Sequence, residues 1–443
     1  MNTLRLLTSK NLLVTSTNVA AIRLLGLLAN LLFISLMGRM FGAEIVGRYS
    51  ISFILIMLSS ILTIQGLQSA IIKFAAGDIA ENKFRLAKAR FFWVREQVTR
   101  NGLICSIILL LLASPLSIYV FNDPLSTNFI RILSICIVPY SFIQVAASFA
   151  QSVHKPVLSM ALSHVAVPLI AGLLLLAGYY LGWNEWLVPI GYTAACMFVA
   201  MMVIILFRRN SDDTSPSILL GKKQKKQMQD VGWPLLWSGI VGVMLGWADT
   251  LMLGALSGPE QAGIYAMAFR IAIFASLARQ IAIKVALGPF AGAVKVGNFR
   301  EQQRLMAFVT HLGLIAVIPL VITACFVPEL ILNIAGNEFR SGALILTIIV
   351  IGEFVSLLFG SPGVAMQVNG QERAFSHVVM VAFFINLIMN AVLIPFFGGV
   401  GAAIATAITS IFQRLIMSFL LFKKTGVVTL AGVSWLRYLT QLK

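Results

Sequence analysis

Long apolar stretches of the sequence contain ionisable side chains at a few positions. Four of these are arginines and two are acids: Arg23, Arg270, Arg279, Arg414, Asp249 and Glu353. If the stretches cross a membrane, each charge costs on the order of 3 kcal/mol, so it normally faces a partner or a water-filled cavity. Arginine stays charged and binds phosphate oxygens through two parallel hydrogen bonds. The arginines are therefore candidate ligands for an anionic substrate that carries phosphate.

Helical spacing ranks these arginines. Arg270 and Arg279 are nine residues apart, which corresponds to about 180° around a helix, so they point to opposite sides. We expect Arg23 and Arg270 to be the principal ligands of the anion. Arg279 and Arg414 are further candidates, and so is Arg48, which lies at the outer end of a predicted span and could instead reach the interface.

The acids and amides of the same stretches each allow two interpretations. Asp249 and Glu353 are candidates for binding a coupling ion, and Asp249 either pairs with an arginine or binds a proton or a sodium ion. The amides serve sugar hydroxyls or a neighbouring helix equally well. These amides are Asn30, Gln65, Gln68, Gln144, Gln151, Asn386 and Asn390.

The sequence lacks the spacings that hold a metal, a nucleotide or a disulfide framework. The four cysteines are scattered through apolar segments, and the four histidines form no H-x-x-x-H pair. Near Gly221, Lys223 and Pro216 stand where a P-loop needs Ser or Thr and Gly. We therefore expect no catalytic residues, no metal ion, no cofactor and no nucleic-acid partner.

Composition places these groups in a membrane. Hydrophobic residues make up 59% of the 443 residues and charged residues 11%, whereas an average soluble protein has about 25% charged residues. A spanning helix needs about 20 apolar residues and satisfies its own backbone polar groups. We therefore expect an all-α polytopic membrane protein with twelve transmembrane helices. The predicted spans are 12–37, 47–76, 98–121, 129–151, 156–180, 186–207, 231–256, 262–291, 305–327, 341–362, 374–397 and 399–422.

Lysine and arginine predict the orientation of these spans. The net charge is +17, and most cations fall in the loops 77–97, 208–230 and 293–304, which we place in the cytoplasm together with both termini. The stretch 81–98 and the tail carry apolar residues at helical spacing among basic ones, which predicts helices on the inner membrane surface. The predicted organisation is an N-terminal lobe at 1–207, a linker at 208–230, a C-terminal lobe at 231–422 and an amphipathic tail at 423–443.

The two lobes share a sequence pattern. Residues 38–49 and 254–265 both fit G-x3-G-x-E-x2-G-x-Y, and the offset is constant because 254 − 38 and 265 − 49 are both 216. The same offset relates Gly182 to Gly398. An even number of spans in each half predicts a parallel repeat, in which two six-helix lobes are related by an axis along the membrane normal.

Three segments carry a resemblance to a known family. The pattern MGRMFGAEIVGRYSIS followed by QGLQSAIIKFAAG, the segment WADTLMLGALSGPEQAGIYAMAFRIA and the C-terminal GGVGAAIATAIT resemble the polysaccharide-exporter branch of the multidrug/oligosaccharidyl-lipid/polysaccharide (MOP) superfamily. The nearest resemblance is to the Wzx-type O-antigen flippases. It extends over nearly the whole chain, and it implies a MATE-like fold.

The resemblance also implies a function. Wzx-type flippases move oligosaccharide repeat units linked to undecaprenyl diphosphate from the inner to the outer leaflet of the bacterial cytoplasmic (inner) membrane by alternating access, as a step of polysaccharide biosynthesis. In relatives, basic residues of the first, second and eighth spans line the cavity, and Arg23, Arg48 and Arg270 match them by location. The implied partners are the lipid-linked oligosaccharide, membrane lipids and a coupling proton or sodium ion.

Two other functions compete with this one. A MATE-like, cation-coupled exporter of small molecules would share the fold, but its cavity should be acidic, whereas the charges here are mainly basic. A membrane glycosyltransferase or polymerase would need a large ordered loop with catalytic groups, and the predicted outer loops are short. We therefore expect a transporter and not an enzyme.

Overall fold

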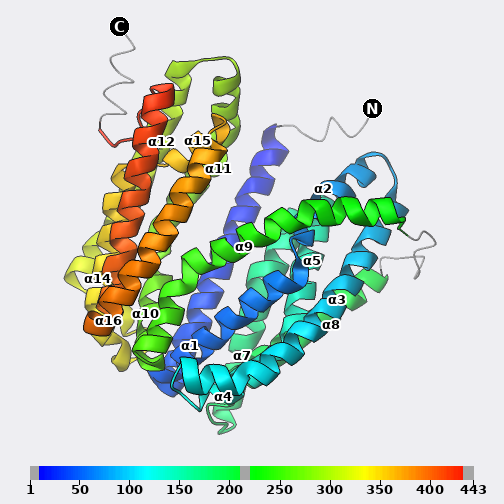
Figure 1. Ribbon diagram of the computed structural model, residues 1–443, viewed down its shortest axis with the longest axis vertical. Coiled ribbons are helices and arrows are strands. Elements are labelled where there is room, and N and C mark those ends of the chain that lie inside the picture. Colours follow the sequence, from blue (N-terminus) through cyan, green and yellow to red (C-terminus); the bar gives the residue numbers. More distant parts are fainter. Residues whose placement is uncertain (1–8, 210–219, 433–443) are drawn as a thin grey trace. The chain divides into compact units, whose positions relative to one another are not determined.

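The computed structural model describes residues 9–209 and 220–432 (Figure 1). Within these two ranges the regular structure is entirely helical. This is expected in lipid, where the backbone N–H and C=O groups must hydrogen-bond to each other because water is absent. The chain divides into two compact units, Met1–Ala248 (unit 1) and Asp249–Lys443 (unit 2). The boundary falls inside α9 (Lys222–Leu256), so that this one helix belongs partly to each unit.

Unit 1 contains the first helices of the chain. They are α1 (Ser9–Ile64), α2 (Leu67–Ala80), α3 (Phe84–Pro115), the π-helical turn η2 (Leu116–Val120), α4 (Ser126–Ser134), α5 (Ile137–Ser152), α6 (Pro156–Met160), the π-helical turn η3 (Ala161–Val165), α7 (Ala166–Tyr180), α8 (Leu187–Arg209) and most of α9. The predicted span 47–76 is broken, because Gln65 and Gly66 both have positive φ between α1 and α2. A chain in that conformation cannot continue a right-handed helix.

Unit 2 contains the remaining helices. They are α10 (Pro259–Ala272), α11 (Phe274–Lys295), α12 (Phe299–Phe326), α13 (Pro328–Leu332), the 3-10 turn η4 (Asn337–Gly342), α14 (Ala343–Leu358), α15 (Pro362–Val368) and α16 (Glu372–Thr425). Helix α12 packs on α11 and α14, and α14 packs on α16 (Figure 1). Helices α11, α14 and α16 carry the charged groups of the candidate site.

Nine helices in the described part of the chain are long and apolar enough to cross a membrane, or ten if the bent pair α4 and α5 forms one span. Helices α1 and α16 have 56 and 54 residues, and each contains one non-helical glycine, Gly42 and Gly398. At about 1.5 Å per residue, each is long enough to cross a core of about 30 Å twice. The all-helical, multi-pass architecture is confirmed, whereas the count of twelve spans stays a prediction.

The shared sequence pattern has a local structural counterpart. Gly42 has φ 86° and ψ 177°, and Gly258 has φ 86° and ψ 170°, a conformation that only glycine adopts without strain. Seven residues later in each half, a buried tyrosine stacks on a phenylalanine. The ring centroids are 5.7 Å apart for Tyr49 and Phe53 and 6.0 Å for Tyr265 and Phe269, each pair at 11°. The two halves therefore share a glycine conformation and a stacked aromatic pair at these positions.

The stretch 81–98 differs from its prediction. It begins α3 instead of forming a separate surface helix, and Phe91, Val94 and Val98 on its apolar face are buried inside unit 1. Helix α3 packs on α2 and α5, so the apolar face is covered by protein and not by lipid. In the tail, α16 ends at Thr425 and is capped by Gly426, and Val427 and Thr429 pack back into unit 2. The remainder of the predicted amphipathic tail, 433–443, lies outside the described residues.

Candidate functional site

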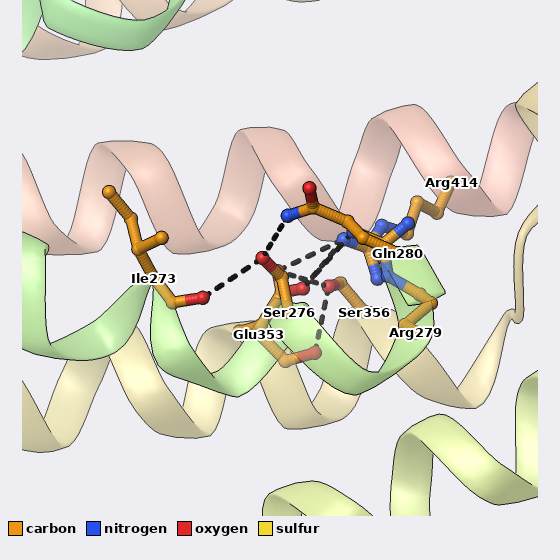
Figure 2. Close-up of polar contacts among 7 residues, drawn as sticks. All are labelled: Ile273, Ser276, Arg279, Gln280, Glu353, Ser356 and Arg414. Atoms are coloured by element: carbon orange, nitrogen blue, oxygen red, sulfur yellow. Dashed lines mark hydrogen bonds and ion pairs between the residues drawn. The ribbon is translucent and has the colours of Figure 1, made fainter. Parts of the chain in front are cut away.

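Glu353 of α14 lies between two arginines from neighbouring helices (Figure 2). Nη2 of Arg414 on α16 lies 2.9 and 3.0 Å from the two carboxylate oxygens and donates to both. Nη2 of Arg279 on α11 is 3.7 Å from Oε1, which is close enough for ionic attraction but beyond hydrogen-bond range. Two guanidinium groups around one carboxylate leave one excess positive charge.

This arginine cluster, Arg279–Glu353–Arg414, also contains unused hydrogen-bond donors. Nε of Arg279 and Nη1 of Arg414 are buried and have no hydrogen-bond partner in the described part of the chain. The side chains of Arg279 and Arg414 as a whole are 18% and 17% exposed, so the cluster is only partly covered by protein. An unused donor that is buried is costly, which makes the cluster a favourable place for an acceptor.

Small residues let α14 approach α16, and α12 approach α11, closely enough to form the cluster. A Cβ atom on Gly352 would lie 2.4 Å from Cβ of Ala407, so only glycine permits this contact between α14 and α16. A Cβ atom on Gly313 would lie 3.2 Å from Cβ of Arg279. Close packing by small residues is a general device of membrane helices. Here it determines how near Arg414 comes to Glu353.

A second polar group surrounds Asp249. The carboxylate is buried and accepts hydrogen bonds from the Tyr265 hydroxyl at 2.7 Å, from Nδ2 of Asn390 at 2.5 Å and from the Thr406 hydroxyl. Nδ2 of Asn390 also donates to Oδ1 of Asn386 at 3.1 Å. All donors are neutral, and no ion pair with an arginine or lysine joins Asp249 among the described residues. The interpretation of Asp249 as an arginine's partner is therefore not what the structure shows.

The internal repeat indicates that the fold does not require these polar groups. The residues 216 positions before Asp249, Asn386, Asn390 and Thr406 are all apolar: Phe33, Ile170, Leu174 and Ile190. In unit 1 the Phe33 ring contacts the Tyr49 ring at 5.5 Å, in the place where Asp249 accepts from Tyr265 in unit 2. A buried carboxylate is costly, and an apolar residue stands at the equivalent position of unit 1, so packing alone does not explain Asp249.

Arg48 has its own acidic partners in unit 1. Its Nε and Nη2 donate to the two oxygens of Asp123 at 2.8 and 3.2 Å, and Nη2 also pairs with Glu44. Burial alone would raise the pKa of Asp123, but hydrogen bonds from Arg48 and Ser126 outweigh it and lower the pKa below its ordinary value. The contact fits a structural ion pair that joins α1 to the start of α4. No local sequence signal marks it, since the partners are 75 residues apart.

The two arginines that spacing ranked first lie in different units. Arg23 is partly buried on α1 of unit 1. Arg270 is 6% exposed near the end of α10 in unit 2, and its Nη1 donates to the carbonyl of Ala266 at 3.1 Å. The structure thus brings together Arg279, Arg414 and Glu353, which the sequence treated as separate candidates. It gives Glu353 arginine partners, although the sequence suggested an ion-coupling role for it.

A family model described as "Polysaccharide biosynthesis protein" matches residues 36–343, which is more than half of the chain. The chain belongs to this family. A relative in Haloferax volcanii, described as a probable low-salt glycan biosynthesis flippase, is 26% identical over 176 residues. That match covers 39% of this chain and only 37% of the relative.

Solved structures show the fold of this polysaccharide biosynthesis protein. A multidrug resistance MATE family transporter of the MOP superfamily in an inward-facing conformation aligns over 92% of this chain and 98% of its own, at 13% identity and a TM-score of 0.70. The lipid II flippase MurJ, inward closed, aligns over 92% and 87% at 14% identity and a TM-score of 0.67. A MOP superfamily transporter from Pyrococcus furiosus, described as having a binding pocket of reversed polarity, aligns over 93% and 95% at 12% identity and a TM-score of 0.63. The expected MATE-like fold is confirmed, and two of these solved structures are described as transporters of the MOP superfamily.

Proposed function

We propose that this protein is a flippase that moves an oligosaccharide linked to a polyprenyl diphosphate from the inner to the outer leaflet of a bacterial cytoplasmic membrane. It works by alternating access, coupled to a proton or a sodium ion, with both termini in the cytoplasm. Its family is described as a polysaccharide biosynthesis protein, and its relative in Haloferax volcanii is described as a probable low-salt glycan biosynthesis flippase. We propose a transporter and not an enzyme.

The observation that carries this proposal is the shared carboxylate of the arginine cluster. Arg270, Arg279 and Arg414 are all arginines of apolar helices in unit 2, whereas one acid, Glu353, is divided between two of them. The second acid, Asp249, is held by neutral donors. The balance is therefore basic and suits a diphosphate. A cationic drug, as in the MATE-like alternative, would need the opposite balance.

Arg23 and Arg270 are the proposed ligands of the diphosphate. A guanidinium keeps its charge at any physiological pH and matches two phosphate oxygens at once. Losing one hydrogen bond to a charged group costs about 1.5–3 kcal/mol, which is roughly ten- to a hundredfold in affinity. A lysine at either position keeps the charge but loses the two-pronged geometry, so it should retain part of the activity.

Asp249 is the proposed site of the coupling ion. Its neutral donors leave the carboxylate without a fixed counter-charge, and the hydroxyl and amide oxygens around it are the ligands that small hard cations prefer. Glu353 is less suited to this role, because Arg414 already neutralises it. Intramembrane acids that bind protons or cations are a common means of coupling in transporters.

The test is transport by the purified protein in proteoliposomes, with a fluorescent oligosaccharide on undecaprenyl diphosphate as the substrate. Arg23→Gln and Arg270→Gln should each reduce the rate about tenfold or more, and Asp249→Asn should abolish its dependence on the ion gradient. Arg340→Gln is the matched control, since Arg340 is exposed and lies on a predicted outer loop. If both arginine variants transport at the native rate, the diphosphate-binding role is wrong. Transport of cationic dyes in place of the glycolipid would favour the MATE-like alternative.

A further inference from the structure

We propose that Arg279 and Arg414 form a binding site for an oxyanion. The carboxylate of Glu353 competes with the oxyanion for these two arginines, which keeps its binding weak enough for release. The proposal rests on the proposed function, because the oxyanion is taken to belong to the transported glycolipid. It concerns residues other than Arg23, Arg270 and Asp249. It reassigns Glu353 from ion coupling to the control of substrate affinity.

The first argument is that Glu353 uses only part of the donors that face it. Arg414 reaches both carboxylate oxygens through a single nitrogen, instead of through the two parallel bonds that a guanidinium can offer. Arg279 approaches only to 3.7 Å. Its Nε and the Nη1 of Arg414 are left buried without an acceptor in the described part of unit 2. Two unused N–H groups beside an excess positive charge fit a second oxyanion.

The second argument is that the surroundings of the cluster are polar and only partly buried. Ser276 and Gln280 on α11 hydrogen-bond each other at 2.9 Å, and the Ser356 hydroxyl lies 3.3 Å from Oε2 of Glu353 (Figure 2). Hydroxyl and amide groups of this kind complement phosphate and carboxylate oxygens. The side chains of Arg279 and Arg414 keep 17–18% of their surface exposed although their two unused N–H groups are buried, so the cluster lies at the edge of the packed helices.

The third argument comes from what transport requires. A transporter must bind its substrate well enough to load it and weakly enough to release it, as ion channels do for their ions. Two permanent cations without a counter-ion would hold a diphosphate too tightly. The carboxylate of Glu353 already stabilises both arginines. The free energy of binding an incoming oxyanion is therefore only what the arginines gain beyond their interaction with Glu353. Glu353 thereby lowers the affinity while keeping the empty site from carrying two uncompensated charges.

The oxyanion has two sources with the same chemistry: the diphosphate of the lipid carrier, or an acidic sugar of the glycan. The experiment is equilibrium binding to the full-length protein in nanodiscs made of zwitterionic lipid. The probes are undecaprenyl diphosphate, undecaprenol as the uncharged control, and a glucuronic-acid glycolipid that lacks phosphate. Each variant is first checked for native thermal unfolding.

Glu353→Gln should bind the oxyanion probe about tenfold more tightly, and Arg279→Gln about tenfold more weakly. The double variant should return to near the native affinity, because the net charge of the cluster is restored. Arg340→Gln should match the native protein. Arg279→Gln keeps the contact between Arg414 and Glu353, so it remains informative if Glu353→Gln does not fold.

The result that would overturn the proposal is unchanged or weaker binding by Glu353→Gln together with unchanged binding by Arg279→Gln. A purely structural salt bridge predicts that outcome, with a loss of stability alone. A response confined to the diphosphate probe identifies the carrier as the source, and a response confined to the glucuronic-acid glycolipid identifies the sugar. If the native protein fails to transport the diphosphate-linked glycan yet binds the acidic glycolipid with these opposite shifts, the proposed function fails and the oxyanion site stands.

Discussion

The buried ion pair between Arg48 and Asp123 offers a quantitative test of the fold of unit 1. The side chains are 5% and 10% exposed and share two hydrogen bonds, at 2.8 and 3.2 Å. Removing one partner of a buried pair typically costs 3–5 kcal/mol, because the remaining charge is uncompensated. Glu44 stays beside Arg48 but is 55% exposed, so it recovers no more than about 1 kcal/mol. We therefore expect Asp123→Ala to lower the free energy of unfolding by about 3 kcal/mol.

A double-mutant cycle separates the pair from the loss of a side chain. Replacing both charges by apolar groups of similar volume is often nearly neutral. The double variant Arg48→Met with Asp123→Leu should therefore be more stable than either single variant, with a coupling free energy of about 2 kcal/mol or more. The measurement is reversible chemical unfolding in detergent micelles, with the exposed Arg131→Ala as control. The reasoning is refuted if Asp123→Ala costs less than about 1 kcal/mol, which is the value of an exposed pair.

Three further predictions follow from contacts inside single units. Because the pKa of Asp123 is lowered in the folded protein, its contribution to the free energy of unfolding is complete above the ordinary pKa of 3.8 and is lost as the pH falls through the lower folded-state pKa. Asp123→Asn should remove this acid-dependent loss from the unfolding curves. Gly232→Ala should reduce the folded yield in the membrane sharply, since its Cβ would lie 2.5 Å from the carbonyl oxygen of Gln65; Gly239→Ala, at 3.3 Å from the nearest atom, is the control. Gln303→Ala should lower thermal stability by several degrees, because it breaks a pair of hydrogen bonds, at 2.6 and 2.9 Å, to the backbone of Val428 just after α16. An unchanged melting temperature would show that this segment does not stabilise unit 2.

Composition and local pattern determined the class of the molecule. Apolar runs long enough to span lipid leave the backbone no alternative to helix, so an all-helical membrane protein follows from the sequence alone. The conformation of the repeated glycines could also be predicted locally, because a positive φ depends on the type of one residue. Gly42 and Gly258 do share their conformation. The arginines inside apolar stretches could be found in the same way, since their cost depends on depth and not on neighbours.

Pairing between distant residues was decided only by the tertiary structure. Helical periodicity placed Arg270 and Arg279 on opposite faces, but it could not say that Arg279 and Arg414 share Glu353, because that contact depends on how closely α11, α14 and α16 pack. Whether Asp249 meets an arginine or neutral donors was open for the same reason. The buried face of 81–98 shows the limit most plainly: the same amphipathic pattern suits lipid or protein, and only the presence of α2 and α5 beside it selects between them.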